Sequence, residues 1–431
     1  ALTWTVIGTE KTSFRFCPVG FLYSNSGYGL FCNNEKTKYY LLGFMNSKIA
    51  ASLLKILSPS MGFESGYLRK LPLIESDSLD SIVERVKHCI DGSNAEWDSF
   101  EISWDFKKHP LLRNVSTISE AFTQWQSECD DRFNQLKANE EELNRIFIDI
   151  YGLQDELTPE VEDKDVTVRK ADLQRDIKSL LSYAVGCMFG RYSLDVEGLA
   201  YAGGEWDSSK YQSYIPDADN VIPITDEEYL DDDIVSRLCA WLKAVYGADT
   251  LEANLDYIAK ALGNKGSTSR EIIRNYFLND FFKDHCQTYS VTGSGKRPIY
   301  WLFDSGKQNG FKALVYLHRY TPDTIGNLRI DYLHKMQRVY ESEINRMQDM
   351  MDHSENAREV AAASKRKDKL AKQLKECREY DEKISHLALS RIELDLDDGV
   401  KVNYRKLQTA QDGKFYEVLA DSKNIMVKEK K

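Results

Sequence analysis

Alternating aromatic, β-branched and polar residues open the chain and predict short strands and turns over residues 1–36. Turns are expected at Pro18-Val19-Gly20 and at Ser26-Gly27, because proline and glycine favour them. A single helix is predicted over 39–57, since apolar residues recur there at three- and four-residue steps. We expect its buried face to consist of Leu41, Met45, Ile49, Leu53 and Ile56.

Helical periodicity dominates most of the remaining sequence. Residues 76–150 are predicted to be mainly helical, and a further helix is predicted over 171–194. A long, highly charged pattern over 328–389 predicts an antiparallel helical hairpin that folds back at 354–356. The segment 394–407 is expected to form a turn and a strand. The fold class predicted is α+β, predominantly α-helical.

The segment "TGSGKRPIYWLFDSGKQNGF", residues 292–311, resembles a nucleotide-binding loop at first sight. A phosphate loop needs a glycine five residues before Gly295, where Ser290 stands, and a hydroxyl residue after Lys296, where Arg297 stands. A strand-like run follows in place of the helix that such a loop requires. The segment therefore predicts two strands, 298–304 and 311–319, and no nucleotide site. Alternation along the first strand places on one face Ile299, Trp301 and Phe303.

Composition narrows the class of protein. The 431 residues carry a formal net charge of −11, which argues against a protein that coats nucleic acid but allows a local basic surface. The eight cysteines form no CxxC pair and no histidine pair has metal-ligand spacing, so we expect reduced thiols, no metal site and a cytoplasmic location. No apolar run approaches the length of a membrane span. The first residue is not Met, and we expect a fragment of a longer protein.

Several long stretches resemble one family. "YYLLGFMNSKIAASLLKILSPSMGFESGYLRKLPLI" is similar to the end of a target recognition domain in adenine-specific DNA methyltransferases fused to restriction functions. "EELNRIFIDIYGLQDELTPEV", "LLSYAVGCMFGRYSLD", "REIIRNYFLNDFFKDH" and "KRPIYWLFDSGKQNGFKALVYLHRYTPDT" resemble the C-terminal half of the PglX (also called BrxX) family. These are the adenine methyltransferases of the BREX phage-defence system. The tail "LDLDDGVKVNYRKL" is also similar to that family.

The resemblance implies four parts: the end of a target recognition domain (1–75), a mainly helical domain with short strands near 297–319 (76–320), a helical hairpin (321–395) and a tail with a turn and a strand (396–431). It also implies that the S-adenosylmethionine site and the Asn-Pro-Pro-aromatic loop lie upstream. The chain has no two adjacent prolines, so we expect no catalytic or cofactor-binding residue in it and no activity alone. The implied partners are double-stranded DNA, the upstream methyltransferase domain and other BREX proteins, without a membrane.

Polar and basic side chains on loops distinguish bases best, while phosphate contacts set the register on the duplex. Loop residues of the recognition segment with this chemistry are Lys11, Thr12, Ser13, Arg15, Asn25, Asn33, Asn34, Lys36 and Lys38. Arg69 and Lys70 are candidates for phosphate contacts, and whether Lys296 and Arg297 contact a phosphate of DNA stays open. The hairpin offers a further basic cluster of Lys365, Arg366, Lys367, Lys369, Lys372 and Lys375.

Each group also has a structural interpretation. The loop residues are compatible with an ordinary polar surface, and the hairpin lysines with a solvated helix face, because Asp368, Glu376 and Glu379 lie among them. The aromatic and basic residues on or beside the two strands could bind DNA but are more typical of a core with a salt-bridged edge; they are Arg297, Tyr300, Trp301, Lys307, His318 and Arg319.

Two other functions stay open. The parent protein could be a fused restriction–modification enzyme, for which an upstream nuclease motif would be needed. The chain could also be a platform that binds other defence proteins and contacts little DNA, as its acidic balance allows. Binding to DNA that weakens steeply with salt separates a DNA-binding region from a platform.

Overall fold

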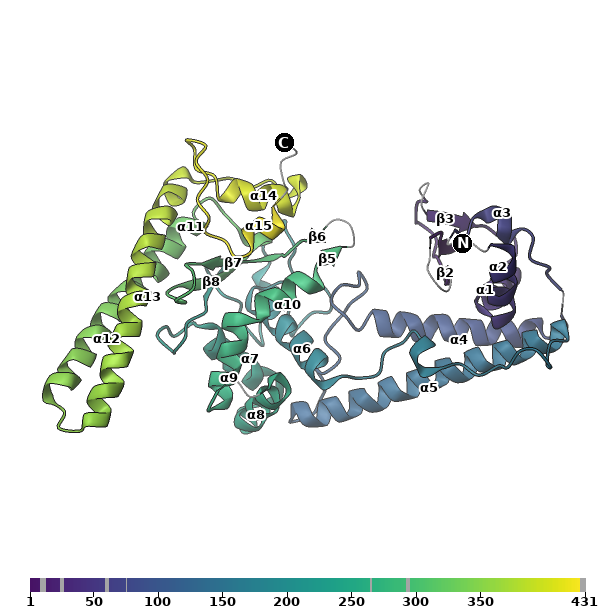
Figure 1. Cartoon of the computed structure of the whole chain (residues 1–431), viewed down its shortest axis with the longest axis horizontal. Coiled ribbons are helices and arrows are strands. Elements are labelled where there is room, and N and C mark those ends of the chain that lie inside the picture. Colours follow the sequence, from purple (N-terminus) through teal and green to yellow (C-terminus); the bar gives the residue numbers. More distant parts are fainter. Residues whose placement is uncertain are drawn as a thin grey trace. The chain divides into compact units, whose positions relative to one another are not determined.

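The structure is a computed structural model that describes residues 1–7, 13–23, 27–58, 62–74, 76–263, 266–291 and 295–426. Two compact units share the chain: unit 1 comprises Ala1–Ser103 and Thr123–Asp172, and unit 2 comprises Trp104–Phe122 and Leu173–Lys431 (Figure 1). Helices account for 56% of the chain beside small sheets, so the predicted α+β, mainly helical class is confirmed. The predicted division into four parts stays a prediction.

Unit 1 contains a three-stranded antiparallel sheet in the order β2-β1-β3. The strands are β1 (Leu2–Thr5), β2 (Phe14–Phe16) and β3 (Gly27–Leu30). Alternation places Leu2 and Trp4 in the core, while Thr3 faces away. The indole Nε1 of Trp4 donates to the carbonyl of Phe63 at 2.8 Å, which ties the sheet to the segment after the first helices.

The single helix predicted over 39–57 is wrong, because two helices occupy this region. They are α1 (Glu35–Asn46) and α2 (Lys48–Leu57), which bend by 68° at Ser47. Ser47 has extended backbone angles, and its hydroxyl accepts from the Ala50 amide as the N-cap of α2. The bend changes the buried face: Met45 and Ile49 are in the core, but Ile56 is 77% exposed.

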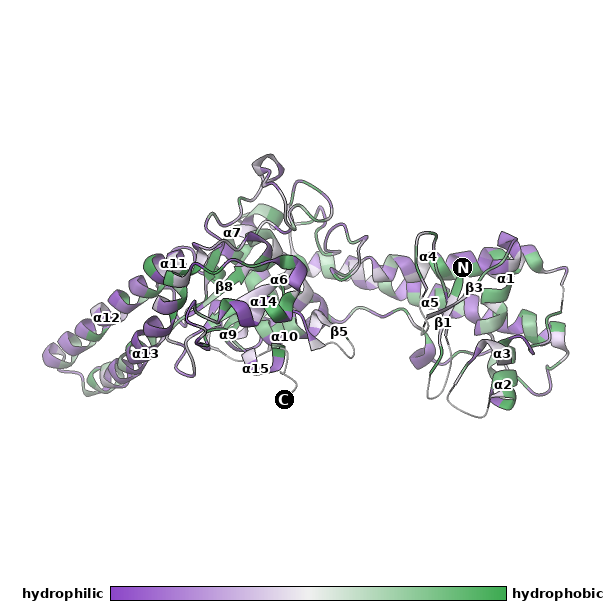
Figure 2. Cartoon of the chain, turned by 90° about the horizontal axis from the view of Figure 1, so that it is seen from above, coloured by the Kyte–Doolittle hydropathy of each residue, from purple (hydrophilic) through white to green (hydrophobic). Residues whose placement is uncertain are grey.

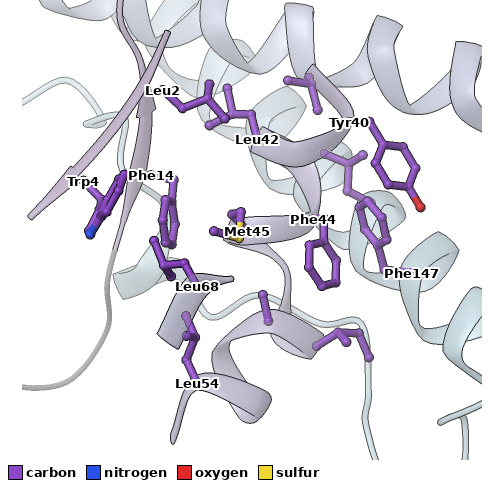
Figure 3. Close-up of a cluster of buried hydrophobic side chains, with 14 of the residues drawn as sticks. Leu2, Trp4, Phe14, Tyr40, Leu42, Phe44, Met45, Leu54, Leu68 and Phe147 are labelled. Carbon is purple, nitrogen blue, oxygen red and sulfur yellow. The ribbon is translucent and has the colours of Figure 1, made fainter. Parts of the chain in front are cut away.

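Apolar side chains of α1 and α2 point into the core of unit 1 (Figure 3). No single helix within the described ranges is long and apolar enough to cross a membrane, and only the bent pair α1–α2 reaches that composition. The first helix also packs on α4 (Leu79–Trp97), where a Cβ on Gly43 would lie 2.9 Å from Val86 Cγ2. Its Tyr40 packs edge-on against Phe147 of α5 (Ile118–Tyr151), and its Phe44 packs against the same ring at a tilt, with ring-centre distances of 5.5 and 5.7 Å. A short helix, α3 (Ser65–Leu68), lies against α2.

Unit 2 is built on an antiparallel sheet in the order β4-β8-β7. The two strands predicted around the glycine segment are confirmed as β7 (Tyr300–Asp304) and β8 (Lys312–Tyr316), and β4 (Val221–Pro223) pairs with β8. Both faces of β7 and β8 are buried, so their aromatics are core residues. Around them lie α6 (Leu173–Met188), α7 (Ile234–Tyr246), α8 (Leu251–Leu262), α9 (Ser269–Asn279) and α10 (Phe281–Thr288). Short β5 (Ser290–Val291) and β6 (Gly295–Lys296) pair antiparallel.

The predicted helical hairpin is present and projects from the rest of unit 2 (Figure 1). We call it the arm; it consists of α12 (His334–His353) and α13 (Ala357–Ser390). The turn lies at 354–356 as predicted, with Asn356 as the N-cap of α13. Hydrophilic residues cover much of both helices (Figure 2). The arm begins after α11 (Thr324–Asn327) and a π-helical turn, η4 (Leu328–Leu333).

The strand predicted within 394–407 is wrong, because this segment forms α14 (Val400–Leu407). Val400 and Val402 alternate as in a strand, yet Val402 is half exposed and the buried residues Asn403, Tyr404 and Leu407 follow helical spacing. Tertiary packing of Tyr404 against the sheet thus overrides β-propensity. The remaining elements are α15 (Ser422–Ile425) and the 3-10 turns η1 (Asp163–Asp165), η2 (Ser208–Lys210), η3 (Leu317–Arg319) and η5 (Leu396–Asp398).

Candidate nucleic-acid interface

Positive charge is concentrated at the start of the chain. Residues 1–70 hold eight lysines and arginines and three glutamates, which gives them a formal net charge of +5. The whole chain carries −11, so the remainder carries −16. Because the local field follows the placement of charges and not their total, residues 1–70 are the best candidate for contact with a polyanion.

Several predicted base-reading residues of unit 1 have structural partners. Asn34 is the N-cap of α1, and its side-chain oxygen accepts from the Lys36 amide at 2.8 Å. The Lys36 ammonium lies 2.7 Å from Asp80, and the Lys38 ammonium lies 3.0 Å from Glu35. The hydrogen bond from Lys38 lowers the pKa of the Glu35 carboxyl. These side chains are already satisfied within the protein.

Other cations of the same segment pair with no described carboxylate. Arg15 is exposed on β2, and Arg69 and Lys70 are exposed at the end of α3. Lys48 and Lys55 lie two turns apart on α2, which packs beside α3. Cations without an internal counter-ion keep their full attraction for phosphate. Ser13 and Asn33 are exposed as well, whereas Lys11, Thr12 and Asn25 lie outside the described residues.

The two predicted cations of unit 2 near the sheet differ from one another. Lys296 on β6 forms an ion pair with Asp421, and this aspartate has a left-handed backbone before α15. Arg297 is exposed and pairs with no described carboxylate, while its backbone amide donates to the Tyr289 carbonyl at 3.1 Å. Only Arg297 of this pair therefore has a side chain available for a ligand.

Two basic residues of α13 attach the arm to the rest of unit 2, and others have partners within the arm. The Arg366 guanidinium makes a two-pronged ion pair with Glu227, and this contact lowers the pKa of the Glu227 carboxyl. The Lys369 ammonium lies 2.5 Å from Asp226, and the Lys367 ammonium donates to Gln348 of α12 at 2.5 Å. Lys375 pairs with Glu379 on its own helix, whereas the exposed Lys365 and Lys372 have no described carboxylate partner.

The glycine segment 305–310 does bind an anion, but the anion belongs to the protein. The carboxylate of Glu376, on α13, accepts from the Ser305 hydroxyl at 2.7 Å and from the amides of Gln308 and Gly310 at 2.8 and 3.0 Å. A Cβ on Gly310 would lie 2.7 Å from the Gln373 carbonyl, so only glycine allows this close approach. The second Ser-Gly-Lys of the stretch, at 305–307, thus belongs to a loop that binds an internal carboxylate, whereas residues 292–294 of the first lie outside the described residues.

Three of the other aromatic and basic residues near the strands have structural roles, whereas Lys307 is exposed. Trp301 is 1% exposed and its Nε1 donates to the Pro298 carbonyl at 3.1 Å. The Arg319 guanidinium donates to three backbone carbonyls and lies 4.4 Å from the ring centre of Trp206. Burial lowers the pKa of His318 to about 4, so the imidazole is neutral. None of the eight cysteines, all of which the structure describes, forms a disulfide, and the described ranges hold no cluster of three metal-binding side chains.

Comparison with known proteins identifies the relationship. No family model matches the chain. It is 48% identical over 417 residues, 95% of its length, to the adenine-specific methyltransferase PglX of Lacticaseibacillus casei (strain Zhang). It is 35% identical over 453 aligned residues, 98% of its length, to the adenine-specific methyltransferase BrxX of Escherichia coli O9:H4 (strain HS). The chain belongs to the PglX (BrxX) family. It spans about a third of these relatives, 34% and 36% of their lengths.

Two cations of this PglX-family chain were absent from the sequence-based candidates. Lys48 and Lys55 lie in the helix that was assigned to core packing, yet Lys55 is exposed. A count of charges over residues 1–70 would have drawn attention to both. The spacing of seven residues on α2 places them on the same side of that helix.

Proposed function

We propose that this chain is the DNA target-recognition and C-terminal region of a site-specific adenine-N6 DNA methyltransferase. The parent protein would use S-adenosylmethionine to mark host DNA in BREX phage defence in the cytoplasm. The names of the two relatives support methyltransferase activity of the parent. The S-adenosylmethionine site and the pocket for the flipped adenine would lie in the part of the relatives that this chain does not cover.

The single observation that carries a DNA role is the net charge of +5 over residues 1–70, in a chain of net −11. Five cations there pair with no described carboxylate: Arg15, Lys48, Lys55, Arg69 and Lys70. In our proposal they hold phosphates and fix the register, and the exposed Ser13 and Asn33 reach base edges. Asn34, Lys36 and Lys38 would contribute less, because each already has a partner in unit 1.

Replacement of two unpaired cations should weaken DNA binding. In the Lys55→Glu, Arg69→Glu variant of the 431-residue chain, we expect affinity for a 30-bp duplex to fall roughly tenfold or more. The slope of log K against log salt should decrease by about 2, since two phosphate contacts are lost. Fluorescence anisotropy between about 50 and 200 mM salt measures both quantities.

The matched control removes the same charge from paired cations of unit 1. Arg145 pairs with Glu142, and the Lys164 ammonium lies 2.7 Å from Glu162. The Arg145→Glu, Lys164→Glu variant should change affinity much less. An equal loss in both variants would mean that net charge alone matters, and it would contradict a defined DNA surface in residues 1–70.

Catalysis is tested separately on the parent. A full-length protein that carries this region should transfer a methyl group from S-adenosylmethionine to adenine in its target duplex, and the 431-residue chain alone should not. If the full-length protein modifies no DNA, the catalytic half of the proposal fails, whatever the DNA affinity.

A platform for other BREX proteins is the second candidate. The charge of −16 outside residues 1–70 favours it, as does the exposure of Trp104, 96% accessible in unit 2. A platform without a DNA role would show no salt-dependent binding to the duplex.

A further inference from the structure

Four basic side chains form a stripe along α13. Arg358, Lys365, Lys372 and Lys383 are all exposed and are spaced by seven, seven and eleven residues. At 3.6 residues per turn these spacings place them within about 40° of one another around the helix. We call these four residues the α13 stripe.

The stripe residues differ in their partners from the cations of α13 that pair with unit 2. Arg366 and Lys369 are engaged by Glu227 and Asp226, as described above. No described carboxylate forms an ion pair with a member of the α13 stripe. Of the other basic residues of α13, four form ion pairs, and Lys367 donates to the neutral side-chain amide of Gln348. The four stripe residues are therefore exposed cations without a described counter-ion.

Two of the acidic residues of α13 are bound by partners outside this helix. The helix holds nine basic and six acidic residues. The Glu376 carboxylate accepts hydrogen bonds from the loop 305–310. The Asp381 carboxylate lies 2.7 Å from Arg329 and 3.0 Å from His334. The ion pair with Arg329 neutralises Asp381, so this acid does not offset the positive charge of the stripe. Glu376 keeps its negative charge, but its carboxylate is bound by the loop 305–310.

The arm presents the stripe in a rigid form. Leu370, Tyr380 and Ile384 of α13 are almost fully buried. Arg378 on α13 lies 2.6 Å from Glu341 on α12, so the two helices are also joined at their surface. From Arg358 to Lys383 the helix rises about 38 Å, close to one turn of B-form DNA. Cations on a fixed scaffold lose little conformational entropy when they bind a regular array of phosphates.

We propose that the α13 stripe binds the phosphate backbone of duplex DNA without regard to base sequence. This inference rests on the proposed function in so far as the parent protein acts on DNA. It adds a second, non-specific contact in unit 2 to the recognition contacts of unit 1. The four positive charges favour a polyanion as the ligand. The length of the stripe, close to one turn of B-form DNA, favours a duplex.

The test uses the 431-residue chain and a 30-bp duplex that carries no target site. In the Lys365→Glu, Lys372→Glu variant we expect affinity to fall roughly tenfold or more and the salt slope to decrease by about 2. The Lys365→Arg, Lys372→Arg variant should bind like the unaltered chain. Both substituted positions are exposed helix positions, and circular dichroism checks that the arm remains folded.

The matched control is Lys335→Glu, Arg338→Glu, which removes the same charge from exposed positions on α12. A small effect in this control with a large effect in the stripe variant supports the proposal. Equal effects in the two variants, or no effect in the stripe variant, would overturn it. The proposal would also be overturned if the stripe variant lost affinity only for a single-stranded RNA or an acidic peptide and bound the duplex normally.

The test of the α13 stripe can fail independently of the test of the proposed function. If the stripe variant binds normally while Lys55→Glu, Arg69→Glu weakens binding, the stripe fails and the DNA role of unit 1 stands. If the unaltered chain binds no duplex at low salt, both proposals fail.

Discussion

Asp233→Ala is expected to lower the free energy of unfolding of unit 2 by about 3–5 kcal/mol, because it leaves a buried arginine without its counter-ion. Asp233 is 0% exposed and pairs with Arg274, which is 6% exposed. The same carboxylate is the N-cap of α7 and accepts from the amides of Val235 and Ser236 at 3.0 and 2.9 Å. The substitution removes the ion pair and the helix cap, and it leaves the Arg274 guanidinium buried without a counter-ion.

The effect can be localised by hydrogen exchange. Urea unfolding measures the change in stability, and amide exchange in the peptides of α7 and α9 shows whether it arises at this ion pair. Asn356→Ala is the matched control, since Asn356 is an exposed N-cap that accepts from Arg358 at 3.0 Å and supports no buried charge. It should cost about 1 kcal/mol. Equal losses for the two variants would show that Asp233 acts only as a cap.

Glu376→Ala is expected to destabilise the attachment of the arm by about 2–4 kcal/mol, since hydrogen bonds to a charged group contribute more than neutral ones. Two amides and one hydroxyl of the loop 305–310 would lose their acceptor together. The loop would then be held to α13 mainly by Gln373, whose amide donates to the Asn309 carbonyl at 3.3 Å. We expect the loop to open locally before unit 2 unfolds.

Amide exchange of Gln308 and Gly310 is the direct measurement for this prediction. Both amides should exchange much faster in Glu376→Ala, and Glu376→Gln should lie between the variant and the unaltered chain because one side-chain oxygen remains. Glu379→Ala, three residues along the same helix and exposed, should leave the loop unchanged. Unaltered protection of the loop in Glu376→Ala would refute the role given to this carboxylate.

Elements with a strong and uninterrupted pattern were predictable. The strands β7 and β8 follow from dense apolar runs around the glycine segment, and the arm follows from a long charged helical pattern with a polar turn at 354–356. The secondary-structure prediction was wrong where a helix cap or a contact with a distant residue determined the element that forms. A single serine cap divides α1 from α2, and burial of Tyr404 makes a helix from a segment with alternating valines.

The candidate site was predictable in part. Residue type identified cations able to bind phosphate, and Arg15, Arg69, Lys70 and Arg297 are indeed without a described carboxylate partner. Residue type alone did not separate them from Lys36 or Lys296, whose counter-ions are Asp80 and Asp421. DNA contact by any of these residues stays a prediction until it is measured.

The amino-acid sequence by itself determined the family, the predominance of helix, the hairpin arm and the excess of positive charge over residues 1–70. These are properties of residue identity and of spacing within a few helical turns. Tertiary structure alone decided which cations remain available. Arg366 is neutralised by Glu227, 139 residues earlier, and Glu376 is enclosed by a loop 66 to 71 residues earlier. Electrostatic pairing depends on distance in space, so the availability of a charge follows from the fold and not from its neighbours in the chain.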